Sequence, residues 1–264
     1  MKKISLATIL FAIAVLVNLL LYIFQPLGNY FYLVSDAAAI VFSFIAFSFG
    51  AASLKLHGFR NIKGRPMFFL IAGIFCWFLG EVAWGFYEIF LKVEVPLFSI
   101  ADFFWLIGYP LFIVGIYFVW SSTRRKIGVK KLASTIMLSA IILIVFYYLS
   151  VPTISTPDLS LTEKVSTAGY IICDSVLLVA MIITLFHISG KELFKLWAAL
   201  LIALVFMSLA DVLFAHIFSN YVSNRTIDAV WNLGYLLIAF GFFMYAKNYR
   251  VALERAFKIQ DKFD

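Results

Sequence analysis

Residues 5–24 read SLATILFAIAVLVNLLLYIF, a run of twenty residues without a charged side chain. At about 1.5 Å of rise per residue, a helix of this length spans roughly 30 Å, the thickness of the hydrocarbon core of a bilayer. Seven further apolar stretches of similar length follow, at residues 30–53, 67–90, 99–121, 131–150, 165–188, 194–218 and 226–246. The sequence therefore predicts an all-α integral membrane protein with eight transmembrane helices.

The composition excludes an ordinary soluble domain. Hydrophobic residues make up 64% of the 264 positions and charged residues 13%, and 30 residues are phenylalanine, whereas soluble domains are about a quarter charged. We therefore expect membrane lipids, and not nucleic acid, to be the partners of this basic chain, whose net charge is +7. Cys76 and Cys173 both lie in apolar stretches, so neither a structural disulfide nor a thiolate metal site is expected.

The loops predict the orientation. The termini and the connections after the second, fourth and sixth stretches carry 18 of the 21 Lys and Arg residues but only four of the 14 acids. The opposite side carries Lys92, Lys164 and Arg225 against ten acids. By the positive-inside rule, both termini are cytoplasmic and the protein is a multi-pass protein of the cell membrane. Asn224-Arg225-Thr226 forms a glycosylation sequon on the outer side, close to a helix start.

The two halves of the sequence also resemble each other, which indicates an internal repeat. The motif YLVSD at 32–36 matches YIICD at 170–174, and LGEV at 79–82 matches LADV at 209–212. The segment IADFFWLIGY at 100–109 matches IDAVWNLGY at 227–235. We therefore predict two parallel four-helix repeats, 1–126 and 127–250, related by a pseudo-twofold axis along the membrane normal, and a basic cytoplasmic tail at 251–264.

Each predicted repeat carries three carboxylates inside or at the edge of its apolar stretches. They are Asp36, Glu81 and Asp102 in the first repeat and Asp174, Asp211 and Asp228 in the second. A charged side chain at mid-membrane costs roughly 2.5–3.5 kcal/mol on insertion scales, so these groups should face the bundle interior. Their depths along the helices all fall in the outer half. We expect one acidic, outward-facing pocket, in which Tyr109 and Tyr235 hydrogen-bond to neighbouring carboxylates.

Structural interpretations compete with this one. Ser99-x-x-Asp102 has the pattern of a capping box, and Asp228 also lies near a helix start. For the deeper acids, the competing explanation is that their hydrogen bonds lock the two halves together. Asp211 and His216 are candidate metal ligands, but their spacing of five places them on different helix faces. No nucleotide-binding or hydrolase motif is present, and we expect no cofactor.

Two neighbouring motifs resemble a known family. They are Gly80-Glu81-x-x-Trp84-x-x-Tyr87-Glu88 and Pro96-x-x-Ser99-x-Ala101-Asp102-x-x-Trp105-Leu106-x-Gly108-Tyr109-Pro110-Leu111. This pattern resembles the multi-span N-terminal sensor regions of bacterial and archaeal diguanylate cyclases and histidine kinases. The resemblance implies a membrane sensor. The 264 residues contain no cyclase or kinase domain, so we expect a stand-alone module that signals to a separate cytoplasmic partner through its basic loops and tail.

Three functions remain open from the sequence. The first is a receptor-like protein that binds a cation, an amine or a lipid headgroup through the carboxylates and tyrosines named above. The second is a proton- or cation-coupled transporter, since parallel repeats and intramembrane acids suit alternating access. The third is an intramembrane lipid hydrolase, similar to eight-span lysoplasmalogenases, in which acids and His216 hold a zinc-activated water. An enzyme is the less favoured interpretation, and no catalytic residue is assigned.

Overall fold

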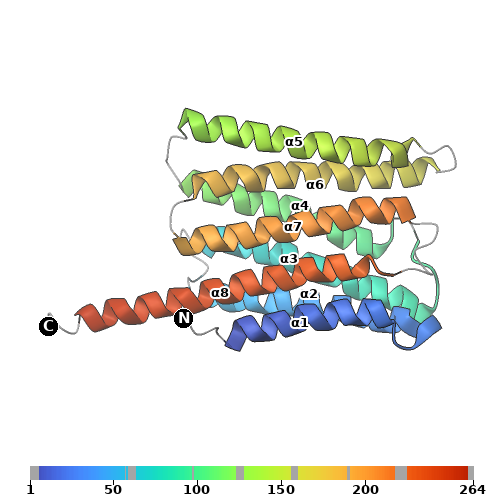
Figure 1. Cartoon of the computed structure of the whole chain (residues 1–264), viewed down its shortest axis with the longest axis horizontal. Helices are drawn as coiled ribbons and strands as arrows, with labels where there is room; N and C mark the ends of the chain where they lie inside the picture. The colour runs from blue at the N-terminus through green and yellow to red at the C-terminus, as the bar shows by residue number, and fades with distance from the viewer. Residues whose placement is uncertain are drawn as a thin grey trace.

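The chain forms a bundle of long helices. The computed structural model describes residues 6–56, 58, 64–96, 98–122, 128–155, 160–188, 191–217 and 225–260 (Figure 1). Within these ranges all regular structure is helical. The helices are α1 (Leu6–Phe24), α2 (Phe31–Lys55), α3 (Gly64–Gly85), α4 (Ile100–Ser122), α5 (Val129–Ile154), α6 (Leu161–His187), α7 (Lys191–Ile217) and α8 (Asp228–Gln260).

All eight helices are long and apolar enough to cross a membrane. The prediction of eight membrane-crossing helices is therefore confirmed at this level, and the architecture indicates a multi-pass membrane protein. In lipid, a helix satisfies every backbone polar group within one segment, which is why apolar sequences of this length fold as helices there. Cys76 and Cys173 are free thiols.

Six of the helices form a closed ring. Going around it, α2 packs on α3, α3 on α4, α4 on α6, α6 on α7, α7 on α8, and α8 returns to α2. The two remaining helices lie outside the ring, α1 against α8 and α5 against α6 and α7, on opposite sides of the bundle in Figure 1. Segments from the beginning, middle and end of the chain thus surround one common interior.

Small residues set the distance between neighbouring ring helices. A methyl group on Gly108 of α4 would lie 3.3 Å from the carbonyl oxygen of Gly73 and would overlap the Trp77 indole. On α8, a methyl group on Gly234 would lie 3.3 Å from the carbonyl oxygen of Ala203. These positions allow the close approach of α3 to α4 and of α7 to α8.

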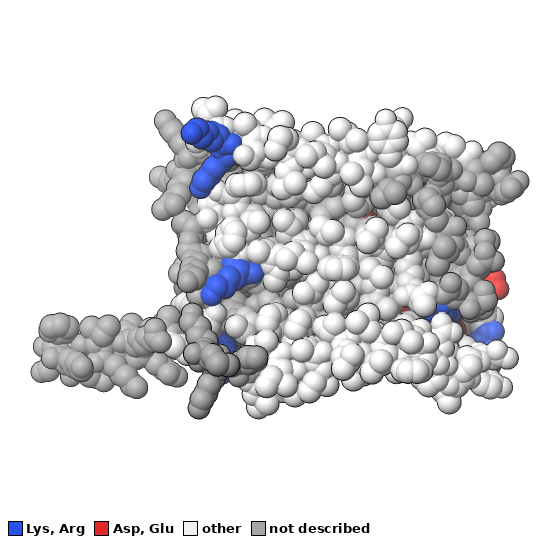
Figure 2. All heavy atoms as spheres, in the orientation of Figure 1, with Lys and Arg blue, Asp and Glu red and all other residues white. Residues whose placement is uncertain are grey.

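The two ends of the bundle differ. The terminal end is where α1 begins and α8 ends, and the pocket end carries the α1–α2 and α3–α4 connections (Figure 1). On the face shown in Figure 2, basic side chains gather mainly at the terminal end, and the long sides are almost entirely uncharged. Helix α8 has 33 residues, about 50 Å at helical rise, and projects past the terminal end. The predicted eighth apolar stretch ends at residue 246, and the helix continues beyond it into the predicted tail as far as Gln260.

Helix α3 changes its winding at the pocket end. After Gly85 it continues as a π-helix, η2 (Phe86–Leu91), and the chain then turns at Lys92, whose φ of 54° lies in the left-handed region. A short 3-10 helix, η1 (Gly28–Tyr30), links α1 to α2. π-helical turns are rare and frequent at functional sites, and this one carries Glu88.

Candidate functional site

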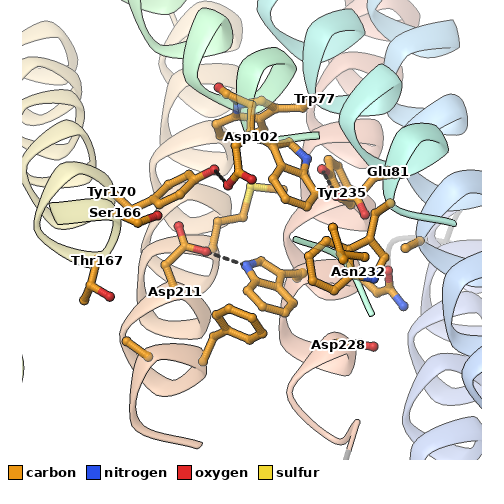
Figure 3. Close-up of a pocket in the computed structure, with 18 of the residues that line it drawn as sticks. Trp77, Glu81, Asp102, Ser166, Thr167, Tyr170, Asp211, Asp228, Asn232 and Tyr235 are labelled. Carbon is orange, nitrogen blue, oxygen red and sulfur yellow. Dashed lines mark hydrogen bonds between the residues drawn. The ribbon is translucent and has the colours of Figure 1, made fainter. Parts of the chain in front are cut away.

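A cavity of about 170 Å³ lies inside the ring of helices. It is far larger than the roughly 10–15 Å³ that a single water needs. All six ring helices line it, together with Val95 and Pro96 of the α3–α4 connection. Its carboxylates are Asp36, Glu81, Asp102, Asp211 and Asp228, and its aromatic side chains include Trp84, Trp105, Phe214 and Trp231. Figure 3 shows side chains converging on the cavity from several helices, among them Glu81, Asp102 and Asp211.

One group of acids is paired with a buried arginine. Arg225, with 4% of its side chain exposed, stands just before α8. Its Nη1 donates to Asp36 Oδ1 at 3.0 Å, and its Nη2 donates to Glu88 Oε1 at 2.6 Å. Asp228 Oδ2 lies 3.9 Å from the same Nη1. We call Arg225, Asp36, Glu88 and Asp228 the arginine cluster. It ties the start of α8 to α2 and to the π-helical turn.

Neutral donors extend this cluster toward α1. Ser35 donates to Asp228 Oδ2, and its hydroxyl also hydrogen-bonds to the Tyr22 hydroxyl at 2.9 Å. The Tyr22 oxygen in turn accepts from Asn232 Nδ2 at 2.9 Å. Asn18 of α1 donates to a backbone carbonyl of α8 at 2.9 Å. These bonds explain why α1, an almost wholly apolar helix, has two buried polar residues, Asn18 and Tyr22.

The other acids accept hydrogen bonds from neutral donors. Tyr235 donates to Glu81 Oε1 at 2.6 Å, and Trp231 Nε1 donates to Asp211 Oδ1 at 2.8 Å. Tyr109 donates to Asp174 Oδ1 at 2.8 Å. We call Glu81, Asp102, Asp174 and Asp211 the neutral-donor acids. The hydrogen bonds expected from Tyr109 and Tyr235 are therefore present, and each joins helices from distant parts of the chain.

Asp102 has two roles. Its Oδ2 accepts from the backbone N–H and the hydroxyl of Ser99, at 2.8 and 2.9 Å. The Ser99 hydroxyl in return accepts from the N–H of Ala101 at 3.2 Å. This is the predicted capping box at the start of α4. The other oxygen, Oδ1, accepts from Tyr170 of α6 at 2.7 Å (Figure 3), so the cap residue also joins α4 to α6.

Four aromatic rings stand beside the neutral-donor acids. Ring centroids are 5.7 Å apart for Trp84 and Trp105, 6.4 Å for Trp84 and Phe214, and 5.5 Å for Phe214 and Trp231. We call these four side chains the aromatic cage. They come from α3, α4, α7 and α8, and each lines the cavity. A positive charge over such faces is attracted by the ring quadrupoles.

Two buried oxygen atoms at the cavity are without a hydrogen-bond donor in the described part of the chain. They are Oδ1 of Asn232 and Oδ2 of Asp36, and both residues line the cavity. Asn232 has no exposed surface, and Asp36 is 4% exposed. Because a buried polar group without a partner costs free energy, these acceptors indicate that the cavity holds water or a ligand with a donor.

The predicted site residues thus fall together at the pocket end. Asp36, Glu81, Asp102, Tyr109, Asp211, Asp228 and Tyr235 line the cavity. Asp174 lies beneath it, 1% exposed, with its carboxyl beside that of Asp211. Among the described residues, no group of three or more potential ligands could hold a metal ion. The side chain of His216 and the sequon residue Asn224 lie outside what the structure describes.

Sequence reasoning missed the importance of Arg225. The sequence marks it as a loop charge and as the middle residue of a sequon, yet in the structure it contacts three acids. Tyr170, Ser35 and Asn232 were also not assigned roles. Tyr170 and Ser35 lie in the matching motifs YIICD and YLVSD, which is a signal that could have found them. For Arg225, its position three residues before Asp228, at a helix start, was the available signal.

Comparisons of the chain with protein-family models, with curated proteins and with solved structures found no match. The resemblance to sensor regions of cyclases and kinases therefore stays a prediction. The candidate site must be interpreted from its own chemistry.

Proposed function

We propose that this protein is a receptor-like protein of the cell membrane that binds a small organic cation in the cavity at the pocket end. The observation that carries the proposal is the charge of the cavity wall. Five carboxylates line the cavity, and Arg225 forms ion pairs with two of them, Asp36 and Asp228. A positively charged ligand would compensate the charge near Glu81, Asp102 and Asp211.

The proposed orientation places the pocket end outside the cell and both termini in the cytoplasm. The distribution of Lys and Arg along the sequence supports it, since loops rich in basic residues stay on the cytoplasmic side. The cavity would then receive its ligand from outside. Helix α8, which projects past the terminal end, would lie on the side where a signalling partner could contact it.

We further propose that the two halves, 1–126 and 127–250, are related by a twofold axis that passes through the cavity. The order of helices in the ring supports this, because exchanging the halves converts the α4–α6 contact into the α8–α2 contact. Corresponding residues also have similar surroundings. Trp231 donates to Asp211, and the equivalent Trp105 indole faces Glu81.

The apolar floor of the cavity favours a receptor over a transporter. Below it lies a second cavity of about 40 Å³, lined only by side chains of Leu, Ile, Met, Phe and Trp. Trp77 and Met207 line both cavities and so separate them. An ion moving from the first cavity toward the terminal end would meet no polar group at this level. The carboxylates therefore fit a site open from one side.

Ligand binding tests the proposal directly. The purified protein, in nanodiscs of phosphatidylglycerol, would be titrated with ethanolamine and with tetramethylammonium while tryptophan fluorescence is followed, since three tryptophans of the cage line the cavity. We expect saturable binding of at least one of these cations. Asp211→Asn should weaken it by at least tenfold.

Glu94→Gln is the matched control, because Glu94 is exposed in the α3–α4 connection. It should bind as the wild type does. Failure of every organic cation to bind, or equal binding by Asp211→Asn and the wild type, would overturn the proposed function. Uptake of the bound cation into sealed vesicles would instead indicate a transporter.

A further inference from the structure

The chemistry of the cavity wall narrows the class of cation. A primary ammonium group binds through three N–H donors and needs several free acceptors around one point. A quaternary ammonium group has no N–H donor and is recognised by aromatic faces and by unpaired negative charge nearby. The aromatic cage and the state of the carboxylate oxygens distinguish these two cases.

Carboxylate oxygens beside the cage already accept hydrogen bonds from the protein. Both oxygens of Asp102 are used, Oδ1 by Tyr170 and Oδ2 by Ser99. Oδ1 of Asp211 accepts from Trp231, and the Asp211 carboxyl also lies beside that of Asp174. An ammonium group at the cage would therefore find few free acceptors, whereas the negative charge of the carboxylates remains.

The indole rings are held in place by the same bonds. Trp231 Nε1 donates to Asp211, and Trp84 Nε1 donates to Glu88 Oε2 at 3.1 Å. With its N–H edge directed to an acid, each of these rings is fixed in orientation while it lines the cavity. The acids thus hold the rings of the cage in position.

The cage also combines corresponding residues of the two sequence halves. Trp84 and Phe214 occupy equivalent positions after the motifs LGEV and LADV, and Trp105 and Trp231 occupy equivalent positions in the matching segments of α4 and α8. The two rings of the first half therefore meet the two rings of the second half at the contact between Trp84 and Phe214. Such an arrangement suits a compact, nearly symmetric cation such as a trimethylammonium group.

The opposite side of the cavity requires a hydrogen-bond donor. In Figure 3, Asn232 lies near Glu81 and Tyr235, across the cavity from Asp211 and Tyr170. Oδ1 of Asn232 is buried and has no donor in the described residues. A hydroxyl group at the other end of the ligand, or a water held by it, would satisfy this oxygen.

We propose that the cavity binds a quaternary ammonium compound, with the trimethylammonium group in the cage of Trp84, Trp105, Phe214 and Trp231 and a hydroxyl donor toward Asn232. Free choline has both features. The headgroup of phosphatidylcholine has the same cationic group but carries a phosphodiester in place of the hydroxyl. This inference rests on the proposed function, because it specifies the cation that the same cavity would take.

A ligand series on the wild-type protein tests the inference without any variant. In nanodiscs of phosphatidylglycerol, which contain no choline, binding of choline, tetramethylammonium and ethanolamine would be measured by isothermal titration calorimetry. We expect choline to bind at least tenfold more tightly than ethanolamine, with tetramethylammonium between them. Equal or tighter binding of ethanolamine would overturn the inference while leaving the proposed function intact. Absence of binding by all three would overturn both.

Variants of the cage provide the second measurement. Phe214→Leu should weaken choline binding by at least fivefold, whereas Phe103→Leu, which changes an exposed ring of α4, should leave it unchanged. Trp231→Phe keeps a ring and should retain more affinity than Trp231→Leu. Thermal unfolding of each variant shows whether it is folded. If Phe214→Leu and Trp231→Leu are folded and both bind choline as tightly as the wild type does, the cage assignment is overturned.

Short-chain lipids identify the source of the cation. Dihexanoylphosphatidylcholine and dihexanoylphosphatidylethanolamine would be added as competitors of choline. Weaker competition by the phosphatidylcholine than by choline itself supports a free solute and the hydroxyl contact with Asn232. Competition by phosphatidylcholine at least as strong as by choline supports a lipid headgroup in the same cage. Preferential competition by the phosphatidylethanolamine would contradict the cage.

Discussion

The arginine cluster and the neutral-donor acids lie in the same bundle end but are stabilised differently. In the cluster, Asp36 and Glu88 each accept a bond from a buried guanidinium group. Among the neutral-donor acids, Glu81 and Asp174 accept from tyrosine hydroxyls. A guanidinium group offsets the charge of a carboxylate, whereas a hydroxyl satisfies one oxygen and leaves the charge in place.

This difference indicates that the two groups of acids have different roles. The arginine cluster closes the ring where α8 meets α2 and the π-helical turn, so its purpose is structural. The neutral-donor acids have no cationic partner in the described part of the chain and stand beside the aromatic cage, so we expect them to be the better candidates for a ligand. If this distinction is right, substitutions in the cluster should affect mainly folding, and substitutions at the cage should affect mainly binding.

The largest expected effect is that of removing the arginine. Arg225→Met leaves Asp36, Glu88 and Asp228 without their counter-ion, and breaking a buried ion pair in this way costs about 3–5 kcal/mol of unfolding free energy. Unfolding of the purified protein by heat or by denaturing detergent would measure it. Adding Asp36→Asn and Glu88→Gln to Arg225→Met should recover part of the loss. A loss below about 1 kcal/mol would contradict the structural role of the cluster.

A smaller loss is expected where a hydroxyl donor is removed. Tyr109→Phe leaves Oδ1 of Asp174 buried without its donor, and hydrogen bonds to charged groups contribute about 1.5–3 kcal/mol. Tyr117→Phe, on the same helix with an exposed side chain, is the matched control and should be neutral. The same unfolding assay compares the two. Equal stability of both variants would mean that the Tyr109 hydroxyl does not hold the two helices together.

The third prediction concerns the stability of a variant of Asp36, an acid of the arginine cluster. Asp36→Asn weakens a charge-assisted bond to Arg225 while Glu88 and Asp228 remain near it, so we expect a loss of about 1.5 kcal/mol. Choline binding should change little. A variant that folds as the wild type does but no longer binds choline would place Asp36 in the ligand site and remove the distinction between the two groups.

The smallest effect on stability is expected at the cage. Asp211→Asn keeps an oxygen that can accept from Trp231 and removes a charge that the described contacts leave without a cationic partner, so the unfolding free energy should stay within about 0.5 kcal/mol of the wild type. The same variant should show the tenfold loss of cation binding proposed above. A large loss of stability with unchanged binding would reverse the roles assigned to the two groups.

The eight helices were predictable because their signal is local. Twenty apolar residues have to form a helix in lipid whatever their neighbours do, and the end of α1 at Phe24 follows from the sequence alone. The exceptions lie where helices leave the apolar layer. The π-helical turn at 86–91 and the extension of α8 to Gln260 depend on contacts and on the aqueous environment, to which hydropathy is insensitive.

The location of the acids was also determined by the sequence. The rise of a helix fixes the depth of Asp36, Glu81, Asp174 and Asp211, and the cost of charge in lipid directs them to the interior. Even the cap of α4 at Ser99 and Asp102 is a local pattern of four residues.

Only the tertiary structure decided which partner each acid has. Arg225 and Asp36 are separated by 189 positions, and Tyr235 and Glu81 by 154. Such pairs form because the ring closes between α8 and α2 and between α4 and α6, and the period of a single helix contains no information about that closure. The same closure brings Trp84, Trp105, Phe214 and Trp231 together. The sequence by itself therefore determined that there is an acidic membrane interior, whereas the fold decided which of its acids contact an arginine and which accept from hydroxyl and indole groups.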